Sequence, residues 1–114
     1  MASEARTTAH FLVSALIRRA SAAGGSAMVL AKGDATSGAI LLVCLDRGVH
    51  HAFLERMPDG AGSVSWQRVG PESRDPQAIA DYLVRRRRID PDLWLVELDI
   101  AGVEQFTAEM TGVG

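Results

Sequence analysis

Apolar side chains in residues 8–23 recur every three to four positions, as in Leu12, Leu16 and Ala23. This spacing places them on one side of an amphipathic helix. Thr8 can cap the helix, because its hydroxyl can accept a hydrogen bond from a free backbone N–H of the first turn. Two glycines follow, and glycine readily adopts the left-handed conformation that ends helices. We therefore predict a helix over residues 8–23.

Four strands are predicted in the middle of the chain, each bounded by turn-forming residues. The segment 39–45 contains no charged or strongly polar side chain, so both of its faces should be covered and it should lie in the middle of a sheet. The last of the four alternates polar and apolar residues, which favours a half-solvated strand towards an edge. The predicted strands are residues 26–31, 39–45, 50–57 and 63–69.

A second helix is predicted from Pro76, with Asp75 as its N-cap. Its apolar stripe continues through Tyr82 and it ends in four consecutive arginines. Asp90 precedes a proline, whose ring disfavours the helical conformation for the residue before it. The helix should therefore stop by about residue 90.

Residues 93–100 alternate as a strand, and residues 103–110 fit one short final helix. The predicted order is α-β-β-β-β-α-β-α. This order indicates an α+β domain, with a mostly antiparallel sheet of about five strands and two main helices packed on one face. We expect a single domain over residues 1–114, with a disordered N-terminus at 1–7 and a flexible tail at 111–114.

The opposite face of that sheet would need its own cover, since the segment 39–45 is apolar on both sides. Two candidates are open: the C-terminal segment 101–114 or a second subunit. Two-fold dimers are the commonest soluble assemblies, which favours a homodimer slightly.

Composition limits the class of protein. The 114 residues carry a formal net charge of -2, which gives no general attraction to nucleic acid or anionic lipid. Cys44 is the only cysteine, so no internal disulfide can form and a reducing compartment is indicated. The longest apolar run, 39–45, is far too short to span a bilayer. We expect a cytoplasmic protein that does not enter membranes.

Several candidate sites are weak. Gly33–Gly38 has the glycine spacing of a phosphate-binding loop, but the lysine and the helix that must follow are replaced by a strand, so a turn is favoured. His50 and His51 are adjacent and would point to opposite faces of a strand, so they cannot share one metal ion. Cys44 lies in the most apolar run and should be core. We predict no catalytic, cofactor-binding or metal-binding residues.

A cluster of arginines is the sharpest candidate for binding. Four consecutive helical residues spread over most of the helix circumference, and cations stabilise a helix C-terminus, so capping and internal pairing are favoured over a patch. On this interpretation, neutralising Arg87 and Arg88 together costs on the order of 1 kcal/mol. The candidate patch consists of Arg85, Arg86, Arg87, Arg88, Arg18 and Arg19.

The sequence also resembles a known family. The features that carry the resemblance are Val13–Arg19, Lys32–Asp34 with Ser37–Ile40, Trp66, Tyr82-Leu83 and Asp90–Trp94 with Glu97. They are similar to domain of unknown function family 1491, small alphaproteobacterial proteins. The resemblance implies a small bacterial cytoplasmic protein and brings no activity, cofactor or catalytic residue with it.

Three hypotheses for function remain. The first is a non-enzymatic module for protein–protein contacts, with an unknown partner or with itself as a homodimer. The alternative is a nucleic-acid or phosphate-ligand binder that uses the arginine cluster, although the net charge argues against nucleic acid. The third and weakest is an enzyme with a site around Asp34, His51 and Arg56, for which no nucleophile and base can be paired.

Overall fold

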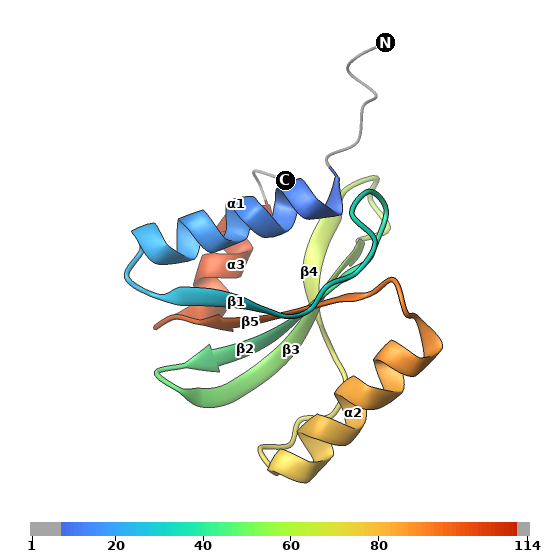
Figure 1. Cartoon of the computed structure of the whole chain (residues 1–114). Helices are drawn as coiled ribbons and strands as arrows, with labels where there is room; N and C mark the ends of the chain where they lie inside the picture. The colour runs from blue at the N-terminus through green and yellow to red at the C-terminus, as the bar shows by residue number, and fades with distance from the viewer. Residues whose placement is uncertain (1–7, 112–114) are drawn as a thin grey trace.

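The computed structural model describes residues 8–111. In it, the chain folds into a five-stranded sheet with helices on both faces (Figure 1). The strand order is β1-β5-β2-β3-β4, and only β2 and β5 run parallel, so the sheet is mostly antiparallel. The α+β class and the order of the elements are therefore as predicted. The elements are α1 (Ala9–Ala22), β1 (Ser26–Ala31), β2 (Ile40–Asp46), β3 (Val49–Pro58), β4 (Val64–Val69), α2 (Pro76–Ile89), β5 (Trp94–Asp99) and α3 (Val103–Thr111).

Strand β2 is the central strand and is buried on both faces, as its uninterrupted apolar run predicts. Leu42 and Cys44 face one core, which α1 and α3 cover; we call this side the α1 face. Leu41 and Val43 face a second core, which α2 covers with Tyr82; we call this side the α2 face. Successive side chains of β2 point to opposite faces of the sheet, so this one strand contributes to two separate cores.

The prediction that the two main helices share one face of the sheet is wrong. Helices α1 and α2 lie on opposite sides of it, with α3 beside α1 (Figure 1). The expectation that the C-terminal segment or a second subunit closes the second face is also wrong, because α2 closes it and Val103 of α3 packs on the α1 face. An apolar stripe shows which side of a helix is buried, but it does not identify the face of the sheet on which the helix packs.

Both long helices begin at the predicted caps. The hydroxyl of Thr8 accepts a hydrogen bond from the backbone N–H of Phe11 at 3.1 Å, and the carboxylate of Asp75 accepts one from Ala78 at 3.2 Å. Each cap satisfies a backbone donor that the helix itself leaves free. The expectations for residues 1–7 and 112–114 lie outside the described residues.

Candidate functional site

Arg86 belongs to the interior of the fold. Its Nη1 lies 2.8 Å from Oε1 of Glu55 on β3 and donates to the hydroxyl of Tyr82 at 2.9 Å. The Arg86 and Glu55 side chains are both more than three-quarters buried, so this pair holds the C-terminal half of α2 to the sheet. Arg86 is therefore occupied by an internal partner.

Arg87 closes the end of α2. Its Nη1 donates to the backbone carbonyls of Pro91 and Leu93, each at 2.7 Å, and lies 3.3 Å from the carbonyl of Lys32. These contacts join the turn after α2 to the loop that follows β1. Because the Arg87 guanidinium bonds to carbonyls of both segments, it holds the turn after α2 against the loop after β1.

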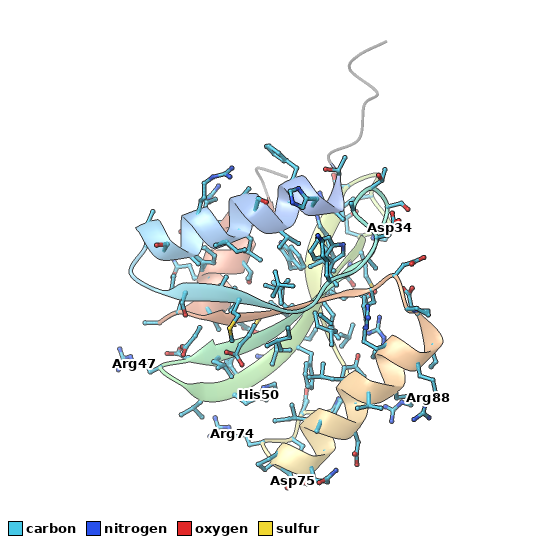
Figure 2. The ribbon with its side chains drawn as sticks, viewed as in Figure 1. Asp34, Arg47, His50, Arg74, Asp75 and Arg88 are labelled. Atoms are coloured by element: carbon cyan, nitrogen blue, oxygen red, sulfur yellow. The ribbon has the colours of Figure 1, made fainter. Side chains whose placement is uncertain are left out.

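The other arginines of the candidate patch are not held in this way. The Cζ atom of Arg85 lies 5.5 Å from the centroid of the Tyr82 ring. Arg88 is exposed and points away from the sheet (Figure 2). Within residues 8–111, neither forms a hydrogen bond or an ion pair. Arg18 and Arg19 are exposed on α1, across the sheet from α2. The structure thus divides the six arginines between two faces, and a joint patch stays a prediction.

The glycine-containing loop between β1 and β2 is organised by Asp34, which Figure 2 places at the start of α1. One oxygen of its carboxylate accepts from the backbone N–H of Ser37 at 2.8 Å, from the Ser37 hydroxyl at 3.1 Å and from the N–H of Thr36 at 3.1 Å. The backbone and hydroxyl hydrogen bonds of Ser37, followed by that of Thr36, lower the pKa of Asp34. The segment is the predicted turn, and the exposed carboxylate of Asp34 bonds back to its own loop.

Glycine is required in this loop because the backbone of Asp92 lies against it. A Cβ atom on Gly33 or on Gly38 would overlap the carbonyl oxygen of Asp92. The N–H of Asp34 donates to that same carbonyl at 3.0 Å. The glycine spacing that resembles a phosphate-binding loop is therefore explained by close packing against the backbone of Asp92.

His50 and His51 point to opposite faces of the sheet, as predicted. The ring of His50 packs tilted against that of Phe53 on the α2 face, with 4.7 Å between the ring centroids, whereas Nε2 of His51 lies 3.5 Å from Oε1 of Glu104 on α3. Arg68 of β4 completes a surface cluster with His51 and Glu104. Across the described part of the chain, no three His, Cys, Asp or Glu side chains are placed to hold a metal ion.

The half-buried His50 and the buried Cys44 have shifted pKa values. Burial, helped by the charges of His51 and Arg74, lowers the pKa of His50, and both of its ring nitrogens are buried without a hydrogen-bond partner among residues 8–111. Burial, with a contribution from Glu104, raises the pKa of Cys44 to about 12. Cys44 is therefore a core thiol, as predicted, and not an activated nucleophile.

The most unusual surface lies on β1, one of the two outer strands. The side chains of Met28, Val29 and Leu30 are 56%, 36% and 43% exposed. Strand β1 pairs only with β5, and no described residue pairs with its other edge. We call this free edge, with Met28, Val29 and Leu30, the β1 edge. The sequence predicts a strand here, and its lack of charge is the one signal that could have marked it as a contact surface.

No helix among residues 8–111 combines the length and the apolar character needed to cross a membrane.

Comparisons with known proteins identify the family. Residues 7–108 match the family described as protein of unknown function (DUF1491). No curated protein matches the chain. The chain therefore belongs to the DUF1491 family.

Three solved structures resemble the fold. A crystal structure of a DUF1491 family protein from Caulobacter crescentus is 36% identical, with a TM-score of 0.73, over 82% of this chain and 88% of that one. An NMR structure of a DUF1491 protein from the same organism is 35% identical, with a TM-score of 0.69, over 82% and 86%. The solution structure of protein Atu0922 from A. tumefaciens is 34% identical, with a TM-score of 0.64, over 82% and 86%.

Proposed function

We propose that this DUF1491 protein is a protein–protein interaction module that associates with a second copy of itself through the β1 edge. The observation that supports the proposal is the combination of an unpaired strand edge with three exposed apolar side chains: Met28, Val29 and Leu30. An unpaired edge offers a row of N–H and C=O groups to any extended strand that approaches it.

The other edge of the sheet has a different character. Strand β4 carries Arg68, whose guanidinium is paired with Glu104, and Gln67, whose amide donates to the carbonyl of Pro58 at 3.1 Å. Charged and polar side chains on an outer strand discourage edge-to-edge pairing. Strand β1, by contrast, contains no charged residue and no proline, so it lacks these two protections.

A second copy of the chain suits this edge. Two identical strands related by a two-fold axis pair antiparallel. Because β1 contains no charged residue, this pairing opposes no like charges. Pairing with β5 is regular from Ser26 to Val29, and a bulge interrupts it at Leu30. Four regular residues span only about 13 Å, so the ladder is short and the dimer should be weak.

Hydrogen exchange tests the role of the edge directly. At high protein concentration, we expect slower exchange for those β1 amides that do not donate to β5, because pairing with a second copy would occupy them. The amides of β4 serve as the internal control and should not change with concentration. Exchange from β1 that is the same at low and high concentration would argue against pairing at this edge.

Binding of a phosphate ligand or nucleic acid through the arginine cluster has less support. Arg86 and Arg87 have internal partners, which leaves Arg85 and Arg88 on α2, and the net charge is -2. We also place the protein in the cytoplasm, which its one cysteine, buried in the core, supports.

A further inference from the structure

A cavity of about 410 Å³ opens between the start of α1, the loop after β1 and strand β3. Its volume lies within the range of small-molecule sites. Apolar walls come from both helix and sheet, and polar groups come from the loop and from one arginine. The lining side chains that matter for binding are Leu12, Thr36, Ser37, Ile40 and Arg56.

Arg56 has no hydrogen-bond or ion-pair partner among residues 8–111. Three arginines of the described chain are at least partly buried, namely Arg56, Arg86 and Arg87. Arg86 is paired with Glu55 and Arg87 with three carbonyls, whereas Arg56 makes no hydrogen bond or ion pair with any residue from 8 to 111. Partial burial of a cation without acceptors is unfavourable, and an anion in the cavity would remove that cost.

The loop supplies neutral groups that can support an anion. The hydroxyl of Thr36 forms no hydrogen bond in the described chain and is free to donate. The carboxylate of Asp34 is directed into its own loop by Ser37 and Thr36, and it is not among the lining residues. The lining formed by the described residues therefore carries one positive charge and no negative one.

The N-terminus of α1 is not the binding group. The N–H groups of Ala9 and His10 already donate to the carbonyls of Thr36 and Ala35, at 3.1 and 2.9 Å, and that of Phe11 donates to Thr8. Recognition must therefore come from the Arg56 side chain. Leu12 of α1 and Ile40 of β2 add an apolar surface to the same cavity, which favours a hydrocarbon chain over a bare inorganic ion.

From this arrangement we infer that the cavity binds a small organic anion. Its carboxylate or phosphate head contacts Arg56 and the Thr36 hydroxyl, and its short aliphatic chain lies along Leu12 and Ile40. A planar guanidinium suits either head group, because it can donate two parallel hydrogen bonds to each. This site is separate from the β1 edge, and it stands or falls independently of dimer formation.

Titration of the labelled protein, followed by ¹H–¹⁵N NMR, tests the inference with three probes of equal chain length: hexanoate, hexyl phosphate and hexanol. We expect saturable shifts at the amides of the cavity with hexanoate or hexyl phosphate and none with hexanol. Whichever anion binds more tightly identifies the preferred head group. Shifts of the same size with hexanol, or no saturable shifts with either anion, would overturn the inference.

Substitution of the arginine provides the matched test. Arg56→Gln should weaken anion binding at least about tenfold, because a charge-assisted hydrogen bond is lost. Arg18→Gln removes an exposed charge from α1 outside the cavity and should leave the affinity unchanged. If Arg56→Gln does not fold, Arg56→Lys keeps the charge without the two-pronged geometry and should bind more weakly than wild type. Unchanged affinity in the variant that folds would contradict the assignment.

Discussion

The indole Nε1 of Trp94 donates a hydrogen bond of 2.7 Å to the backbone carbonyl of Asp34, sixty residues earlier in the chain. The Trp94 side chain is almost completely buried, and its N–H therefore needs an internal acceptor. A second link runs from the backbone N–H of Trp94 to the carbonyl of Ala39 at 2.8 Å. Two of the segments that carry the family resemblance, Lys32–Asp34 with Ser37–Ile40 and Asp90–Trp94, thus hold each other in place.

We predict that Trp94→Phe destabilises the protein by about 2–4 kcal/mol. The change leaves the carbonyl of Asp34 without this donor and creates a cavity in the core. Trp66→Phe is the control, because Trp66 is only half-buried and its indole donates to no described residue; we expect a loss of about 1 kcal/mol. Urea unfolding measures both, and equal losses would show that the Trp94 hydrogen bond is unimportant.

Arg87→Gln should cost about 2 kcal/mol of stability, and Arg88→Gln less than about 1 kcal/mol. The two residues are neighbours of the same type, but Arg87 donates to the carbonyls of Pro91 and Leu93, whereas Arg88 is exposed. The sequence alone predicts that neutralising both arginines together costs about 1 kcal/mol of stability, which is less than the structure predicts for Arg87 alone. Thermal unfolding distinguishes the two accounts, and the sequence-based one prevails if the variants lose equal stability.

His50 should make the protein less stable in mild acid. Its folded pKa lies below the ordinary value of 6.5, mainly because of burial. As the pH falls below about 6.5, His50 becomes protonated in the unfolded chain but stays neutral in the folded protein. The folded protein therefore loses stability until the pH reaches the lower folded pKa of His50. His50→Phe removes this titration and two unpaired ring nitrogens.

We expect His50→Phe to unfold at higher urea concentration than wild type at pH 5, with a smaller gain at pH 8. A gain that is the same at both pH values would mean that protonation of His50 does not oppose folding.

Much of the fold could be predicted from residue patterns. The caps Thr8 and Asp75 and the apolar run 39–45 act locally, so they fix where helices begin and which strand is central. The distribution of helices could not be predicted in this way, because it depends on how the chain crosses from β4 through α2 to β5. The face that a helix covers is a property of topology rather than of its own sequence.

The candidate sites were less accessible to prediction. Four arginines in a row look alike in sequence, and only tertiary contacts separate Arg86 and Arg87, which are satisfied internally, from Arg85 and Arg88, which are not. Likewise, nothing local distinguishes Arg56 from any other arginine on a strand. Among residues 8–111 it has no acceptor, and this depends on the loop and the helix that surround it.

Met28 lies at the centre of the proposed interface between two copies of the chain. Sedimentation equilibrium over a range of protein concentrations should show a mass that rises from 12.2 kDa towards twice that value. Met28→Lys should remain at 12.2 kDa throughout, because a lysine on an outer strand opposes edge pairing. Val84→Lys alters a side chain on α2 that is 57% exposed, against 56% for Met28, and should associate as wild type does. A wild-type protein that stays monomeric at every concentration, or a Met28→Lys variant that dimerises like wild type, would contradict the account.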